Sequence, residues 1–182
     1  MSKSRRLKNT VSARRNVKNT VDVMSVNDVD RYLRQNRNIV FDFSFGKSFN
    51  SCRTSRFDNC LRDAADFVER FKDSMKTINK LSQHSVAELF DRGNEFRHCH
   101  NIDDKDDVVR DIIEKVYGDD DFVRQNCEGE RFYQAGYEKG MRFIGIIKAN
   151  VFYVVLVDYF HNLYSDNKQN TRSRKSHNYS IE

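Results

Sequence analysis

The spacing of apolar residues predicts helices in the middle of the chain. From Leu61 to Leu81 they recur at steps of three and four, with charged residues between them, so we expect an amphipathic helix over 58–81. Ser85 and Glu88 have the spacing of a capping box, which predicts a short second helix over 85–92, before Gly93.

The chain before these helices predicts one more helix and a strand. Residues 25–38 fit a short helix with Ser25 or Asn27 as its N-cap. Residues 39–45 alternate, with an isoleucine and three phenylalanines on one side, so we expect a half-buried strand with an aromatic face.

The segment 103–121 contains both an apolar stripe and an unusually large number of acidic residues. It holds nine acids and three bases, and its valines and isoleucines predict a third helix that Gly118 ends. The acids at 103–107 favour the helix dipole, whereas those at 119–121 would follow the C-terminus, where the dipole does not favour them.

The pattern in the last third of the chain predicts strands. We expect them over 131–137, 141–148 and 151–158, the last two joined in a hairpin. Residues 151–157 are apolar at every position, which is typical of a central strand covered on both faces. The order of elements predicts an α+β fold, with an antiparallel sheet of about four strands against two or three helices.

Charge is concentrated at the two ends of the chain. Of 182 residues with a net charge of +5, residues 1–20 carry seven bases and no acid, and residues 168–182 carry four bases and one acid. We therefore expect a basic N-terminal arm (1–24), a single domain (25–166) and a basic C-terminal tail (167–182), both ends flexible. Such arms bind polyanions, although solvated tails have the same composition. The expected nucleic-acid contacts are Arg5, Arg6, Arg14, Arg15, Lys18, Arg172, Arg174 and Lys175.

Composition narrows the class of protein. Four cysteines in 182 residues are too few for a disulfide scaffold, and no apolar run is long enough for a membrane span. No apolar region of a secretory signal follows the basic N-terminus. We expect a cytoplasmic protein without a membrane partner. Phosphate-binding loops, dinucleotide fingerprints, nucleophile elbows and calcium loops are absent from the sequence.

Residues 97–100, Arg-His-Cys-His, form the densest group of reactive side chains. His98 or His100 could exchange a proton with a substrate while Arg97 stabilises phosphate charge. Metal binding is also open, because His98 and His100 would point to one side of an extended segment, but no spacing supplies the remaining ligands. In a third interpretation His98 and His100 are structural, one of them buried and hydrogen-bonded and the other exposed. We expect neither a metal nor a cofactor.

A second candidate group follows the last strand. His161 could donate or accept a proton with Asp158 orienting it, and Tyr164 could stack on a base or bind a phosphate. Asp158 could instead cap the turn.

The stretch from Arg142 to Tyr164 is similar to the ending of a group of small, mostly uncharacterised bacterial and phage proteins. These end in Arg-Φ-x-Gly-Φ, a hairpin and Phe-Tyr-Φ-Φ-Φ-Φ-Asp-x-x-His-x-Leu-Tyr, where Φ is apolar. The Phe-x-Phe at 43–45, Cys52 and the His-Asn-Ile at 100–102 fit the same group. In outline the hairpin and its exit also resemble RelE-type ribonuclease toxins, which cut messenger RNA. That resemblance implies Arg142, His161 and Tyr164 as catalytic residues, with His98 and His100 as additions.

Three functions follow as hypotheses. The first is a metal-independent endoribonuclease of toxin–antitoxin or phage-defence type. The second is a non-catalytic adaptor or inhibitor of mobile-element origin that binds nucleic acid, RNA more readily than DNA, or a ribonucleoprotein. The third is a nucleic-acid mimic that uses the acids of 103–121.

Overall fold

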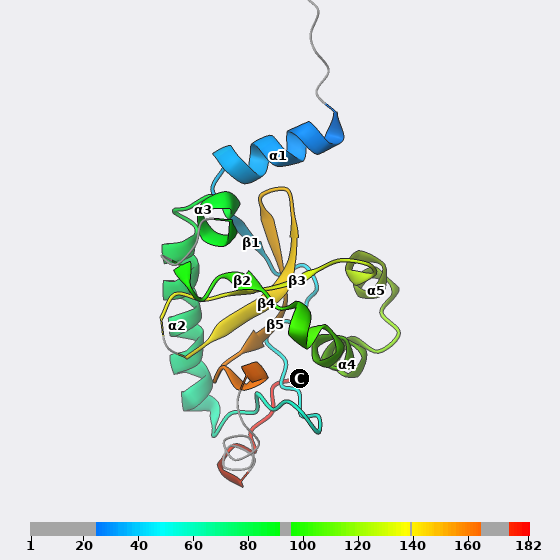
Figure 1. The fold of residues 1–182 in the computed structure, drawn as a ribbon. Coiled ribbons are helices and arrows are strands. Elements are labelled where there is room, and N and C mark those ends of the chain that lie inside the picture. The colour runs from blue at the N-terminus through cyan, green and yellow to red at the C-terminus, as the bar shows by residue number, and fades with distance from the viewer. Residues whose placement is uncertain (1–24, 92–95, 139, 165–174) are drawn as a thin grey trace, which may run out of the picture.

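The fold is a five-stranded mixed sheet with helices on both faces (Figure 1). The computed structural model describes residues 25–91, 96–138, 140–164 and 175–182. The strands are β1 (Val40–Asp42), β2 (His100–Asn101), β3 (Phe132–Ala135), β4 (Arg142–Lys148) and β5 (Val151–Asp158). The α-helices are α1 (Val26–Asn36), α2 (Ala64–Leu81), α3 (Val86–Phe90), α4 (Asp106–Tyr117) and α5 (Asp121–Cys127), and the 3-10 helices are η2 (Asp103–Lys105) and η3 (Asn162–Tyr164).

The α+β class is confirmed, but the sheet differs from the expected one. It has five strands in the order β1-β5-β4-β3-β2, and β1 runs parallel to β5 while the other pairs are antiparallel. The fifth strand is β2, which is only two residues long and pairs with β3. Sequence periodicity needs four or more residues to register, so β2 leaves no signal. The prediction that residues 151–157 form an inner strand is confirmed, because β5 lies between β1 and β4.

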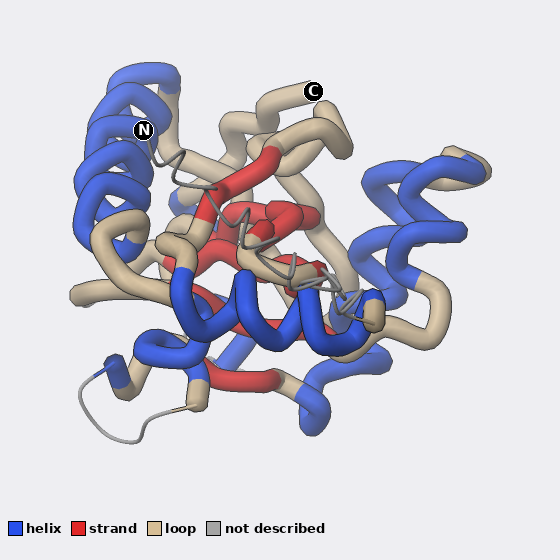
Figure 2. Tube along the Cα trace, turned by 90° about the horizontal axis from the view of Figure 1, so that it is seen from above, coloured by secondary structure: helices blue, strands red, loops and turns tan. Residues whose placement is uncertain are grey.

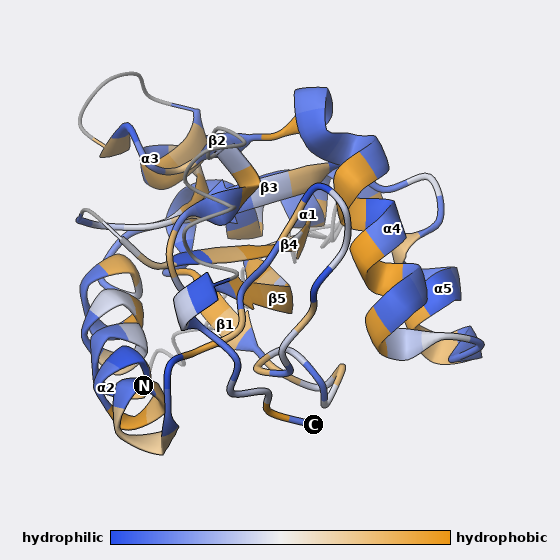
Figure 3. Ribbon diagram, turned by 90° about the horizontal axis from the view of Figure 1, so that it is seen from below, coloured by the Kyte–Doolittle hydropathy of each residue, from blue (hydrophilic) through white to orange (hydrophobic). Residues whose placement is uncertain are grey.

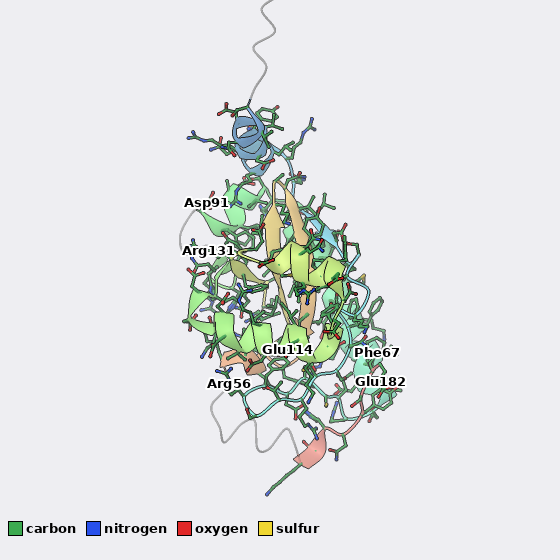
Figure 4. All side chains as sticks on the ribbon, turned by 90° about the vertical axis from the view of Figure 1, so that its right-hand side faces the viewer. Arg56, Phe67, Asp91, Glu114, Arg131 and Glu182 are labelled. Atoms are coloured by element: carbon green, nitrogen blue, oxygen red, sulfur yellow. The ribbon has the colours of Figure 1, made fainter. Side chains whose placement is uncertain are left out.

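Helices lie on both sides of the sheet (Figure 2), and each face has its own core. On one face α2 and α3 pack Leu81, Val86 and Leu89 against Phe143 and its neighbours; we call this the α2 face. On the other face α4 and α5 contribute Val109, Ile112 and Val123; we call this the α4 face. The apolar stripes of α4 and α5 turn toward the sheet in Figure 3. Figure 4 shows the outer side of these helices, where Arg56 forms ion pairs with Asp107 and Asp111.

A β-bulge in β5 decides which way the end of that strand faces. Ile144 pairs with Leu156 but Gly145 pairs with Val154, so Val155 is an extra residue. Val155 and Leu156 consequently both lie on the α4 face, whereas Val154 and Val157 lie on the α2 face. The extra residue shifts the alternation, and Asp158 is carried to the α4 face opposite Arg142.

Several predicted elements end at residues that capping explains. The helix expected over 58–81 begins at Ala64, because the side chain of Asp63 accepts a hydrogen bond from the Asp66 amide. The capping box of Ser85 and Glu88 is confirmed, as is Ser25 as the cap of α1. A fifth helix, α5, was not expected.

The acids at 119–121 explain α5. After the C-terminus of α4 these acids oppose its dipole, but Asp120 is the N-cap of α5 and Asp121 lies in the first turn of that helix. At that position the same charges favour the helix dipole. The acids do follow α4, but the expectation that the helix dipole disfavours them was wrong for Asp120 and Asp121, which lie at the N-terminus of α5.

The aromatic strand expected over 39–45 stops at Asp42. The carboxylate of Asp42 accepts a hydrogen bond from the amide of Ser44, which turns the chain. Phe41 and Phe43 join the core of the α2 face, while Phe45 joins that of the α4 face. The expectation that all the aromatic rings share one side was wrong.

The last residues of the chain pack against the domain. Leu61 and Tyr179 exchange two backbone hydrogen bonds, and the Ser51 amide donates to the Ile181 carbonyl. The ring of His177 stacks on Phe160 at 4.5 Å. Residues 175–182 are thus attached to the body and not a flexible tail. Among the described residues, none of the helices combines the length and hydrophobicity that crossing a lipid bilayer requires.

Candidate functional site

The five residues that the sequence singled out lie at one end of the α4 face. Strand alternation puts His100 on the same side as Ile102, which belongs to that core, and the turn before β2 brings His98 Nδ1 within 3.1 Å of Arg142 Nη2. His100 pairs in register with Gln134, and Arg142 pairs with Asp158. The turn after β5 then brings His161 and Tyr164 to the same place. Sequence segments 98–100, 142 and 161–164 therefore converge.

Arg142 lies at the centre of the group and is buried, with 1% of its surface exposed. Its Nη1 donates to three carbonyls of the β3–β4 loop, those of Glu138 (2.7 Å), Gly140 (3.1 Å) and Met141 (2.8 Å). Its Nη2 lies 3.1 Å from His98 Nδ1. Burial lowers the pKa of Arg142, although Asp158 opposes that effect. A guanidinium held by carbonyls in this way fixes its neighbours and does not itself face solvent.

Gly136 makes room for that arginine. A Cβ built on Gly136 would lie 2.6 Å from Arg142 Cδ, closer than carbon atoms can approach. The buried side chain of Arg142 therefore requires glycine at position 136, directly after β3.

His98 is half-buried and lies between two arginines. Besides the contact to Arg142, its Nε2 lies 3.3 Å from Nε of Arg97, which is exposed. Burial is the main cause that lowers the pKa of His98, and the charges of Arg142 and Arg97 lower it further. His98 is therefore neutral at physiological pH.

His100 has both ring nitrogens engaged. Nδ1 lies 2.7 Å from the Asn101 carbonyl, which can only accept, so Nδ1 carries a proton. Nε2 lies 3.3 Å from Nε2 of Gln134. Gln134 is itself buried, and its Oε1 has no hydrogen-bond partner among the described residues. His100 is thus tied to the sheet and oriented by Gln134.

His161 is the histidine of the group whose ring is available. Neither of its nitrogens has a hydrogen-bond partner among the described residues. Burial, followed by the charges of Arg142, His98 and His100, lowers the pKa of His161 to about 4. Its backbone has φ of 59°, in the left-handed region that non-glycine residues rarely adopt and that recurs at functional sites.

Tyr164 borders the group on its exposed side. Its ring centroid lies 5.7 Å from that of His161 and 6.2 Å from that of His100, and Nζ of Lys105 lies 5.1 Å from it. The hydroxyl donates to Asp104 at 2.9 Å. Partial burial, with Asp104 adding to it, raises the pKa of Tyr164, so the phenol stays protonated.

Asp158 supports the turn that carries His161. Its carboxylate accepts hydrogen bonds from the amides of Phe160 (3.3 Å), Asn162 (2.9 Å) and Leu163 (2.9 Å). No hydrogen bond joins Asp158 to the ring of His161 among the described residues. Of the two roles considered from the sequence, the structure therefore gives Asp158 the capping role.

The cysteines take no part in this group as ligands or nucleophiles. All four are buried thiols, and burial raises the pKa of Cys99, the one nearest the histidines in sequence, to about 11. Within the described residues, no three His, Cys, Asp or Glu side chains are grouped so as to hold a metal ion.

The expected nucleic-acid contacts are mostly outside the described residues. Arg5, Arg6, Arg14, Arg15, Lys18, Arg172 and Arg174 fall in 1–24 and 165–174. Lys175 is described and exposed, on the segment that packs against the body.

Four residues around the group were missed from the sequence. Gln134 and Gly136 lie in a predicted strand, where a buried glutamine looks like any other polar position. Asp104 and Lys105 looked like helix-terminal charges. The pairing of β3 with β2 brings Gln134 to His100. The hydrogen bond from Tyr164 in η3 to Asp104 in η2 brings Asp104 to the same group.

Comparison with known proteins identifies a family for this chain, but that family has no described function. No curated protein and no solved structure matches the chain. One family model, described as Uncharacterised protein UU032, matches residues 44–182. The match covers β2 to β5, every residue of the histidine group and the packed C-terminal segment. Since it spans well over half of the chain, this protein belongs to the family of Uncharacterised protein UU032.

Proposed function

We propose that this protein is a metal-independent endoribonuclease that cuts RNA at the histidine group. The observation that carries the proposal is the convergence of His98, His100 and His161 around the buried guanidinium of Arg142. Titratable groups with shifted pKa values, gathered at one end of a sheet, are typical of catalytic sites.

The available imidazole has the protonation state of a general base. His161 is neutral at physiological pH, since its pKa lies at about 4, and both ring nitrogens lack partners among the described residues. His161 would take the proton of a ribose 2′-hydroxyl as that oxygen attacks the adjacent phosphorus. The bond from phosphorus to the 5′-oxygen would break, leaving a 2′,3′-cyclic phosphate.

Other side chains would serve the same step. Tyr164 stays protonated and is 37% exposed, so its hydroxyl can pass a proton to the leaving 5′-oxygen and regain one from His161. Arg97 and Lys105 supply exposed or half-exposed positive charge for the phosphate. The resemblance to RelE-type toxins implies that Arg142 is a catalytic residue, but a 1% exposed guanidinium is better suited to positioning His98.

The test is cleavage of a fluorescently labelled RNA by the full-length protein in the presence of a chelator. We expect products with 2′,3′-cyclic phosphate ends, and no cleavage at a site carrying a single 2′-deoxy substitution. His161→Ala should lower the rate by about 10²–10⁴-fold.

His84→Gln is the matched control. The ring of His84 contacts that of Phe96, with centroids 4.7 Å apart, beside the core of the α2 face, so this variant should cleave as the parent does. If the double variant His100→Ala/His161→Ala cleaves as fast as the parent, the ribonuclease proposal is wrong.

The charge of the chain ends favours a second candidate, a non-catalytic binder of RNA, DNA or a ribonucleoprotein. Seven bases without an acid in residues 1–20 would release counterions from a nucleic-acid backbone. Under this alternative, deleting residues 1–20 removes affinity and flattens its salt dependence, while the histidine variants leave binding unchanged and no strand is cut.

A further inference from the structure

A cavity of about 420 Å³ lies between α4 and α5, which run side by side in Figures 1 and 3. Its apolar walls are Ile113 and Tyr117 of α4 and Cys127 of α5, all buried or half-buried. The volume falls within the range of small-ligand sites and far exceeds what a single water molecule needs. The cavity is therefore large enough to take a long side chain.

The acids that border this cavity differ from the other acids of 103–121 in having no partner. Elsewhere in that segment the carboxylates bind an arginine or a tyrosine or cap α5, as for Asp103, Asp104, Asp106, Asp107, Asp111, Asp120 and Asp121. The two that remain, Glu114 and Asp119, have no side-chain hydrogen bond or ion pair among the described residues, and both line the cavity. Glu128 lines it as well and is likewise unpaired within the described part of the chain.

The two arginines that line the cavity do not neutralise these carboxylates. Nε of Arg110 donates to Asp106 at 2.7 Å, and Arg124 forms an ion pair with Asp121. The cavity thus combines three unpaired carboxylates with an apolar wall. The carboxylates suit a guanidinium, and the wall suits the methylene groups of the arginine that carries it.

The N-terminal arm of the same chain has the complementary charge. Residues 1–20 hold seven bases and no acid, and four of the bases are arginines: Arg5, Arg6, Arg14 and Arg15. The described chain begins just before α1, and the 24 residues that precede it span roughly 80 Å when extended. A folded chain of 182 residues has a radius of gyration of about 16 Å, so this length reaches from α1 to the cavity. Because the tether gives an effective concentration on the order of millimolar, a weak contact is enough for binding.

We propose that the cavity between α4 and α5 binds the side chain of an arginine from the N-terminal arm of its own chain. The guanidinium donates to the three unpaired carboxylates, and the methylene groups pack on Ile113 and Tyr117. A docked arginine is not free to bind a phosphate, so the cavity competes with nucleic acid for the arm. This docking requires no RNA cleavage and stands apart from the proposed function.

A nitroxide on the arm of the full-length protein tests the contact. The four native cysteines are buried, so the Ser12→Cys variant carries a thiol that can be labelled selectively. At low salt we expect the label to broaden the amide signals of Gly118, Asp119 and Glu128 more than those of α2. At about 1 M salt, where the screening length is about 3 Å, this difference should disappear.

Neutral variants of the labelled protein show whether the carboxylates hold the arm. Glu114→Gln/Asp119→Asn/Glu128→Gln should lose the local broadening, because no acceptor of full charge remains for the guanidinium. The matched control, Asp30→Asn/Glu138→Gln, removes two exposed charges outside the cavity and should broaden as the parent does. Glutamine in place of the four arginines of the arm should also abolish the local broadening.

Two results would overturn the proposal. One is broadening at the cavity that persists without the three carboxylates, or that spreads evenly over the surface. The other comes from mixing spin-labelled protein of natural isotope abundance with isotope-labelled protein that carries no nitroxide. Broadening at the cavity in this mixture would show that the arm of a second copy enters it, in place of the arm of the same chain.

Discussion

His161 concentrates two unfavourable features in one side chain. Its backbone has a positive φ, and its imidazole is partly desolvated beside other positive groups. Each feature costs stability, and folded structures keep such costs mainly where function needs them. The surrounding contacts hold the turn in place, since Asp158 accepts three backbone amides there.

The lowered pKa of His161 predicts a pH dependence of stability. The pKa falls from its ordinary 6.5 to about 4 on folding, so between these values the unfolded chain binds a proton that the folded chain does not. Stability from this residue is complete above pH 6.5 and is lost as the pH falls toward 4. Going from pH 7 to pH 5, the parent should lose roughly 1 kcal/mol more than His161→Gln, after allowance for solvent screening.

Urea unfolding of both proteins at pH 7 and pH 5 measures this difference. Equal losses for the parent and His161→Gln would show that His161 titrates normally. The proposed general base would then lack the desolvated setting that we assign to it.

At the scale of elements, short polar signals placed the helix ends better than apolar periodicity did. Ser25, Asp63, Ser85 and Asp120 each accept a hydrogen bond from an amide in the first turn of the helix that follows. Periodicity alone extended the helix ending at Leu81 back to residue 58. The cap at Asp63 stops it because the backbone there is extended and not helical.

The cap of α5 can be tested with neighbouring acids. Asp120→Ala should lower the free energy of unfolding by about 1 kcal/mol, because the side chain accepts from the amides of Phe122 and Val123. Asp119→Ala removes the same charge one residue earlier, where the side chain is exposed and caps nothing. Chemical denaturation of the two variants compares them. A larger loss for Asp119→Ala would mean that charge and not capping matters here.

At the scale of the whole molecule, the C-terminal segment connects distant parts of the chain. Tyr179 pairs with Leu61 just before α2, Ile181 bonds Ser51, and His177 stacks on Phe160 beside the site turn. The family match ends with the same segment, at residue 182. Both observations make 175–182 part of the domain.

Removing residues 175–182 should therefore destabilise the fold. We expect the free energy of unfolding to fall by roughly 2 kcal/mol, because several backbone hydrogen bonds and a ring stack are lost. Thermal and urea unfolding measure the loss. If the protein without residues 175–182 unfolds like the parent, this segment does not stabilise the fold.

Much of the architecture was accessible from the sequence because it depends on local patterns. Apolar spacing predicted α2 and α4, the uninterrupted apolar run of β5 predicted an inner strand, and the helix–strand order predicted an α+β fold. The candidate site residues could be selected by chemical type alone. Their catalytic role stays a prediction, since neither the fold nor the family states an activity.

The sequence by itself determined most of the helices and strands and which side chains are candidates for chemistry, since both depend on residues near one another in the chain. Only the tertiary structure decided that these side chains meet. The bulge at Val155 turns Asp158 toward Arg142, the pairing of β2 with β3 brings Gln134 to His100, and packing buries Arg142 between His98 and the β3–β4 loop. These contacts depend on strand register and on burial, and neither is encoded by spacing along a single segment.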